Sequence, residues 1–358
     1  MTRKAALLTE ALSHLLLSFV CGLFLFGSFA QSMGNDAVLP GTGGVFFWIL
    51  TCGLRPFFGL ILDEYPRLHA QTAGCVLVGI ACLLPVAWGW GALLTAAVGY
   101  ALFLTGAGGE SLAFARGFFS RSALVFAGGL LGMSIGTLAP LWGLPRVIPG
   151  LLAFLPGGAV FFFAETRKYP RRIRSFRHSV SRNLPKGAVL GLNLVPLLAI
   201  SFTAALIVPS DFDGYFRIFP ALFSTAGVVA GGYVADRFGP RKAAVIGFSV
   251  ALPLLTVFTH IPWLCCLGFG ALFVPLSVVL GTSTISLSTH PHFAFGLCSV
   301  ALLVGQLPAL FGLHITATVR ILAAVFLTVA LAVSAFLYSD HCKLFARSFL
   351  HRENGGRR

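Results

Sequence analysis

The sequence is short of charge. Only 10% of its 358 residues are charged, whereas 57% are hydrophobic and the mean hydropathy is +0.90. A soluble domain carries about 25% charged residues, so this composition excludes an ordinary water-facing surface. Gly occurs 41 times, and small residues let membrane helices approach closely. The composition predicts an all-α polytopic membrane protein.

Motifs for bound metals and nucleotides are also missing. The eight cysteines form no Cys-x-x-Cys pair and no Cys/His ligand spacing, which argues against a disulfide framework or a zinc site. No Gly-x-x-x-x-Gly-Lys-Ser/Thr loop is present, which argues against direct use of ATP. We therefore expect no metal and no cofactor.

Acidic residues are few, 11 against 25 Lys and Arg, so a nucleic-acid partner has to be considered. The placement of the basic residues argues against it. Eight lie between Arg167 and Lys186, and five lie between Lys343 and Arg358. These segments flank apolar runs, where the positive-inside rule places Lys and Arg. The expected partner is the lipid bilayer, including anionic lipids at its cytoplasmic face.

Twelve stretches are apolar enough and close enough to the 20 residues that a transmembrane helix needs. They cover approximately 6–29, 43–62, 71–88, 91–109, 122–141, 147–164, 187–208, 214–235, 241–259, 262–286, 293–313 and 318–338. With an even number of spans both termini share one side, and 21 of the 25 basic residues fall on it. We expect an integral protein of the cell (inner) membrane with both termini cytoplasmic.

The basic segment 165–186 divides the chain. It predicts an N-terminal bundle of six helices over 1–164, a C-terminal bundle of six over 187–338, and a basic cytoplasmic tail over 339–358. A short repeat supports this division: Gly59 precedes Asp63 by four residues, as Gly232 precedes Asp236, and the two aspartates are 173 residues apart. Many transporters are built from such paired halves.

The second copy of this repeat carries a family resemblance. The stretch Gly-Tyr-Val-Ala-Asp-Arg-Phe-Gly-Pro-Arg-Lys, from Gly232 to Lys242, resembles the loop Gly-x-Leu-Ala-Asp-Arg-x-Gly-Arg-Arg/Lys of the major facilitator superfamily. The resemblance implies twelve helices in two halves and a secondary active transporter. The gating residues that it implies are Gly59, Asp63, Arg67, Gly232, Asp236, Arg237, Gly239, Arg241 and Lys242.

The signature has a physical rationale and two departures. Gly239 permits a tight turn, and Asp236 can accept hydrogen bonds from the N-terminus of a neighbouring helix. Pro240 shifts the basic pair by one place. The first copy has Glu64, Tyr65 and Pro66 where the family has Arg, any residue and Gly.

Charged side chains inside a span are costly and are therefore candidates for function. Arg55 lies eight residues before Asp63, about 12 Å along a helix with a 1.5 Å rise. We expect Arg55 to face a central cavity and bind an anionic group, with Glu10 or His14, which share one helix face, as a proton-coupling partner. The alternative is that Arg55 pairs permanently with Glu10, and that His14 is a structural histidine.

Two amides in later spans are candidate substrate ligands. Asn193 lies in the seventh span and Gln306 lies in the eleventh. Each can donate to and accept from a solute. The alternative is that each bonds across helices.

Glycines recur in the fifth span at Gly128, Gly132 and Gly136, followed by Pro140. This spacing clears one helix face for close packing. It also resembles, loosely, a glycine-and-proline motif of antiporters in the same superfamily. Packing is the simpler interpretation.

Three functions fit these observations. The first is secondary active transport of a small-molecule substrate by alternating access, with an anionic or amphiphilic solute and proton coupling as its candidate features. The second is a transport-inactive scaffold or sensor, which the altered first loop favours. The third is a membrane enzyme that uses His290 and His292, against which we count the lack of a nearby carboxylate. We expect no enzyme.

Overall fold

The structure is a computed structural model. It describes residues 3–29, 42–66, 68–115, 117–145, 147–165, 180, 184–207, 218–313 and 316–340. Nearly all of these residues lie in helices, and the one extended contact in this part of the chain is an isolated bridge between Val180 and Tyr338.

The elements before residue 166, called here the N-terminal helices, follow the predicted spans. They are α1 (Arg3–Gly22) and η1 (Leu23–Phe29), α3 (Thr42–Glu64), α4 (Ala70–Leu83), η2 (Val86–Trp88), α5 (Gly89–Ala115), α6 (Phe119–Gly136), η3 (Ala139–Leu141), α7 (Val147–Val160) and η4 (Phe161–Glu165).

The elements after residue 185 are called the C-terminal helices. They are α8 (Lys186–Leu206), α9 (Phe219–Phe238), α10 (Pro240–Thr256), α11 (Pro262–Phe273), α12 (Leu276–Ser286), α13 (Pro291–Leu310) and α14 (Ala317–Leu337). The predicted tenth span, 262–286, is divided between α11 and α12 at Val274 and Pro275, because proline cannot donate the backbone hydrogen bond that a continuous helix needs.

The helices suit a bilayer in length and composition. Within the described ranges, eight stretches are long and apolar enough to cross a membrane, and Ala70–Leu83 and Val147–Phe163 are shorter apolar helices. Leu, Ile, Val and Phe side chains are exposed along these helices, for example Phe57 and Val325, as lipid-facing surfaces require. The predicted number of twelve spans goes beyond these eight and stays a prediction.

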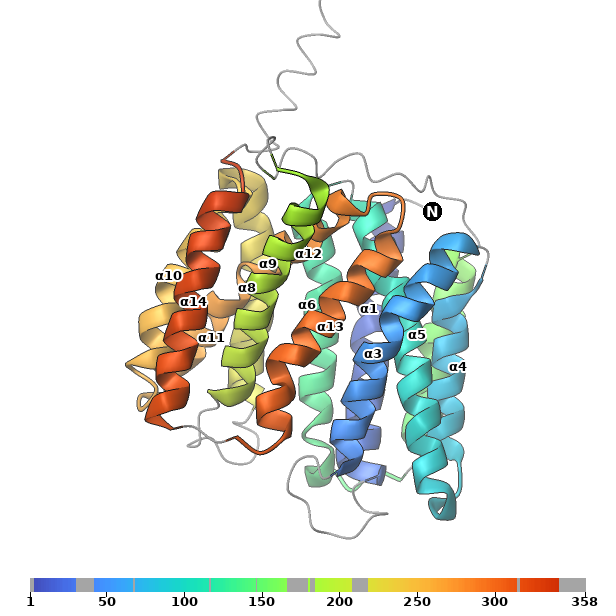
Figure 1. The fold of residues 1–358 in the computed structure, drawn as a ribbon. Helices are drawn as coiled ribbons and strands as arrows, with labels where there is room; N and C mark the ends of the chain where they lie inside the picture. Colours follow the sequence, from blue (N-terminus) through green and yellow to red (C-terminus); the bar gives the residue numbers. More distant parts are fainter. Residues whose placement is uncertain are drawn as a thin grey trace, which may run out of the picture.

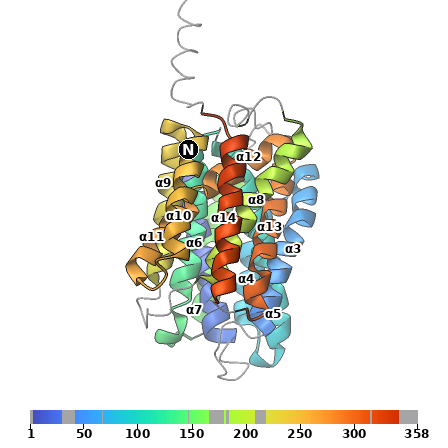
Figure 2. The same ribbon diagram turned by 60° about the vertical axis from the view of Figure 1, so that its left-hand side comes forward.

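The helices run side by side and alternate in direction (Figures 1 and 2). We call the side on which α1 begins and α14 ends the terminal side; it is the upper side in Figure 1. The ends of α3 and α9 and the starts of α6 and α13 also lie there.

The glycines of the fifth predicted span pack α6 against α1. A β-carbon added at Gly128 would lie 2.5 Å from the Ala11 carbonyl oxygen, and one at Gly136 would lie 2.6 Å from Gly22 Cα. Gly132 faces the Leu15 carbonyl in the same way. These contacts support the packing interpretation of the glycine spacing.

Candidate functional site

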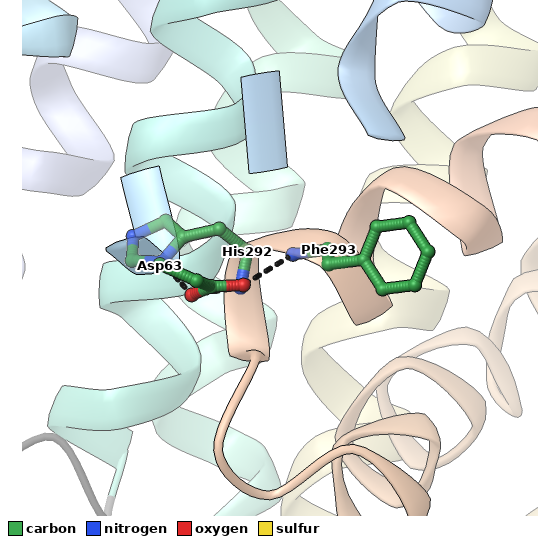
Figure 3. A network of polar contacts seen from close by, with 3 residues as sticks. All are labelled: Asp63, His292 and Phe293. Atoms are coloured by element: carbon green, nitrogen blue, oxygen red, sulfur yellow. Dashed lines mark hydrogen bonds and ion pairs between the residues drawn. The ribbon is translucent and has the colours of Figure 1, made fainter. Parts of the chain in front are cut away.

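Asp63, at the end of α3, accepts hydrogen bonds from the start of α13 (Figure 3). Its carboxylate lies 3.0 Å from Phe293 N, 3.3 Å from His292 N and 2.7 Å from His292 Nδ1. The first N–H groups of a helix have no partner within the helix, and a carboxylate satisfies them and interacts favourably with the helix dipole. Asp63 thus caps a helix that lies 229 residues further along the chain.

Asp236, near the end of α9, does the same for α6. Its carboxylate accepts hydrogen bonds from Phe119 N at 2.8 Å, from Ser120 N at 2.9 Å and from Ser120 Oγ at 2.5 Å. The sequence predicts that Asp236 accepts hydrogen bonds from the N-terminus of a neighbouring helix, and this is confirmed. Asp63, on an N-terminal helix, therefore caps a C-terminal helix, whereas Asp236, on a C-terminal helix, caps an N-terminal helix.

The glycine four residues before each aspartate makes the approach possible. A β-carbon at Gly59 would lie 2.6 Å from Phe293 N, and one at Gly232 would lie 2.8 Å from the Phe119 carbonyl oxygen. Any larger residue would push the capped helix away. The repeated Gly-x-x-x-Asp pattern thus builds the same contact twice.

The rest of the signature forms the turn between α9 and α10. Gly239 has φ of 105°, which favours glycine. Arg241 pairs with Asp340 at 3.1 Å, so the turn is tied to the residues after α14. Arg237 and Lys242 are exposed. Arg67 lies outside the described residues.

Arg55, in α3, is buried against α13. Its side chain is 7% exposed, and Nη1 donates to Ser299 Oγ at 2.8 Å. Among the described residues Arg55 forms no ion pair with Glu10, which was the predicted alternative. That Arg55 faces a central cavity stays a prediction.

Two further polar groups, His14 of α1 and Tyr100 of α5, are buried. The His14 ring lies 5.9 Å from that of Phe103, and its Nδ1 has no hydrogen-bond partner among the described residues. Tyr100 shares a 2.9 Å hydrogen bond with Ser18. That Arg55 and His14 form one site stays a prediction.

Glu10 belongs to a separate polar cluster. Gln71 Nε2, at the start of α4, donates to Glu10 Oε1 at 3.0 Å and to Glu110 Oε2 at 3.1 Å. Glu10 and Gln71 are fully buried. The amide joins α1, α4 and α5, and its position explains how two carboxylates are accommodated near each other.

Asn193 bonds across helices, as its predicted alternative states. Its Nδ2 donates to the Val279 carbonyl at 2.6 Å, and its Oδ1 accepts from Thr282 Oγ1 at 2.8 Å and from the Tyr338 hydroxyl at 2.7 Å. The amide is fully buried, and it ties α8 to α12 and to the end of α14.

Gln306 lies on α13 with a partly exposed side chain. It has no hydrogen bond to another described residue. Of the two candidate amides, Gln306 is therefore the one that makes no hydrogen bond within the described part of the chain, and its role as a substrate ligand stays a prediction.

The sequence did not reveal several partners. The positions of Ser299, Ser120, Gln71 and Tyr100 follow no recognisable sequence pattern. The statement that His292 lacks a nearby carboxylate is wrong, since Asp63 lies 2.7 Å away. The two residues are 229 positions apart in the sequence, so the sequence alone does not indicate this contact. Pro291 followed by a polar residue could have indicated the start of α13, because proline is favoured in the first turn of a helix.

No family model matches this chain, and no curated protein matches it. Solved structures do. The major facilitator superfamily transporter FucP in the outward conformation superposes with a TM-score of 0.64 and 13% identity, over 92% of this chain and 98% of that one. A variant of the Escherichia coli fucose:proton symporter FucP gives 0.63 and 12% identity, over 94% and 99%.

These matches define the class of fold. The chain has the fold of the major facilitator superfamily, as the signature loop predicts, and it is an integral membrane protein. FucP is the particular transporter that both matched structures represent. At this level of identity the likeness shows the fold alone.

Proposed function

We propose that this protein is a secondary active transporter that moves a small solute across the membrane by alternating access. The observation that carries the proposal is the pair of aspartate caps. Asp63 and Asp236 join the N-terminal helices to the C-terminal helices on the terminal side, each through a helix start.

Such contacts suit a reversible closure. Each consists of hydrogen bonds from two backbone N–H groups to one carboxylate, and water can take the carboxylate's place when the helices separate. The fold supports the same function, because both solved structures named above are of a transporter, FucP.

The substrate we propose is anionic or amphiphilic. Arg55 supplies a buried positive charge, and the interior of the N-terminal helices holds aromatic pairs: Phe103 beside His14, and Phe47 stacked on Tyr100 with ring centroids 6.0 Å apart. Charged groups inside membrane proteins face the bundle interior and commonly mark a substrate path. Gln306 is the second proposed ligand.

Proton coupling is part of the proposal. An unperturbed histidine titrates in the physiological range, and Glu10 lies one turn before His14 on the same helix. Protonation of either group changes the charge inside the membrane and so changes the affinity for an anion. Asn193 contributes to packing in this arrangement.

We place the protein in a cell (inner) membrane with the terminal side cytoplasmic. The described residues Arg121, Lys186, Arg237, Arg241 and Lys242 lie on that side, in accord with the positive-inside rule. The basic segments 165–186 and 339–358 then face anionic lipid headgroups, and the bundles 1–164 and 187–338 are the two moving halves.

The test is a thermal-shift screen of purified wild type and Arg55→Ala with anions and amphiphiles, followed by flux assays of the hits in proteoliposomes. A ligand at 100 times its dissociation constant stabilises the native state by about 2.7 kcal/mol. An anion that shifts wild type alone, and that crosses the membrane in proteoliposomes, supports the proposal. Equal shifts of the thermal midpoint in both proteins would show that Arg55 does not bind the ligand.

A scaffold or sensor is the second candidate. Its support is the sequence Glu64-Tyr65-Pro66, which replaces the basic end of the first signature loop. The contact that this loop precedes is nevertheless complete at Asp63. A scaffold would keep that contact closed under all conditions.

A further inference from the structure

Arg55 has more hydrogen-bonding capacity than its protein partner uses. A guanidinium carries five N–H donors. Among the described residues, Arg55 makes one hydrogen bond, to Ser299, and its Nε is buried without a partner. No carboxylate in this part of the chain pairs with it; the ion pairs found there are Arg241 with Asp340 and His292 with Asp63. Among the described residues, the charge is therefore buried against a neutral hydroxyl, an unfavourable arrangement.

The Ser299 hydroxyl belongs to α13, so its bond to Arg55 joins an N-terminal helix to a C-terminal one. The two helices are in close contact at this level. A β-carbon added at Gly296, one turn before Ser299, would lie 2.6 Å from Pro56 N. This packing leaves no room for a solute between α3 and α13 at Gly296. A ligand that approaches Arg55 from the α13 side therefore competes with Ser299.

We propose that a monocarboxylate displaces Ser299 as the partner of Arg55, so that substrate binding opposes the closed contact between α3 and α13. This inference rests on the proposed transport function and specifies its substrate class and its coupling. Binding of the substrate then breaks the hydrogen bond between Arg55 and Ser299.

Charge and shape select a monocarboxylate. One negative charge neutralises the one guanidinium, whereas a dianion would leave excess charge in an apolar interior. Two carboxylate oxygens match the guanidinium fork. The surroundings favour an apolar body, since Phe295, one turn before Ser299, stacks on Phe126 with ring centroids 5.8 Å apart.

Thermodynamic linkage gives two observables. If the anion and Ser299 compete, the anion shifts α3 and α13 apart, and weakening the Ser299 bond strengthens anion binding by the same factor. The His292 and Phe293 amides report the separation, because both are capped by Asp63 on α3 while the helices are together.

The test combines hydrogen–deuterium exchange in segment 291–296 with binding of benzoate, acetate and inorganic phosphate. The proteins are wild type, Ser299→Ala, Arg55→Gln and Ser201→Ala. Ser201 is the matched control, because its hydroxyl donates to the Leu302 carbonyl on α13 from α8, away from α3.

We expect benzoate to accelerate exchange in wild type and to leave Arg55→Gln unchanged. Ser299→Ala should bind benzoate about tenfold more tightly, which corresponds to one charge-assisted hydrogen bond. Ser201→Ala should bind as wild type does. Acetate should act more weakly than benzoate, and phosphate should have no effect.

Four results would overturn the inference. Benzoate that binds wild type without accelerating exchange, or that binds Ser299→Ala no better, rules out displacement while leaving the transport function standing. Binding of phosphate in preference to benzoate rules out the monocarboxylate. If none of the three anions binds, the hypothesis of an anionic substrate is excluded. Alternating access is then tested separately by distance measurements. The wild-type exchange experiment decides the question even if Ser299→Ala does not fold.

Discussion

Asp63 and Asp236 are related by position and by action, although 173 residues separate them. Each stands near the end of its helix, four residues after a glycine, and each accepts hydrogen bonds from the start of a helix in the other part of the chain. Their partners differ in one respect: Asp63 also contacts an imidazole, that of His292, and Asp236 contacts a hydroxyl, that of Ser120.

Neutralising either aspartate should loosen the terminal side. Loss of a helix cap costs about 1 kcal/mol, which is about fivefold in an equilibrium constant. Asp63→Ala should therefore raise amide exchange in segment 291–296 about fivefold, and Asp236→Ala should do the same in segment 119–122. Glu64→Gln, which alters the exposed carboxylate next to Asp63, is the control. Equal exchange in all four proteins would show that the caps do not hold the helices together.

The glycines beside the caps should be sensitive to a single methyl group. Gly59→Ala places a carbon against the backbone of Phe293, whereas Gly53→Ala, on the same helix, meets no atom within 4 Å. Overpacking costs about 1–3 kcal/mol, so Gly59→Ala should shift the population toward a separated terminal side. Spin labels at Leu68 and Thr289, both exposed, would measure this as longer distances. The idea fails if Gly53→Ala has the larger effect.

The glycine face of α6 should matter for stability. Gly132→Ala drives a methyl group into the Leu15 carbonyl of α1, whereas Gly191→Ala, on α8, enters open space. We expect Gly132→Ala to lower the thermal midpoint by several degrees, since it destabilises the helix pair by about 1–3 kcal/mol. Gly191→Ala should leave the midpoint unchanged. If Gly132→Ala instead alters transport with an unchanged midpoint, the antiporter-like interpretation of this motif gains support.

Asn193 should act through stability. Asn193→Ala leaves the buried Tyr338 hydroxyl without its acceptor, and an unsatisfied buried group costs about 1–3 kcal/mol. Thermal unfolding should show a clear loss of stability with unchanged anion affinity. Tyr338→Phe, which removes one donor and leaves the amide with its other partners, should cost less. Loss of anion binding at an unchanged midpoint would make Asn193 a substrate ligand.

The sequence was most informative where one local pattern determines one local structure. Apolar length located the helices to within a few residues of their observed ends, and the signature loop indicated the cap at Asp236. Gly239 marked the turn between α9 and α10. These features depend on backbone conformation and hydropathy, which neighbouring residues determine.

The partners of buried polar groups could not be predicted in the same way. Arg55 was expected beside Glu10 or in a cavity, and its hydrogen-bond partner, Ser299, lies 244 residues away. Glu10 is held by Gln71, and Asp63 meets His292. Such pairs depend on how helices pack in three dimensions, and the chain contains many serines that are equally compatible with the role of Ser299.

Alternating access is the central claim, and two spin-label pairs in inhibitor-free protein test it most directly. One pair, at Leu68 and Thr289, reports the terminal side, and the other, at Trp88 and Phe311, reports the opposite side; all four positions are exposed. The seven cysteines in the described residues are buried, so replacing Cys342 with serine leaves the engineered cysteines as the accessible thiols. We predict two distance populations for each pair, with the terminal side lengthening when the opposite side shortens. A single unchanged population for both pairs would contradict the account and favour a scaffold.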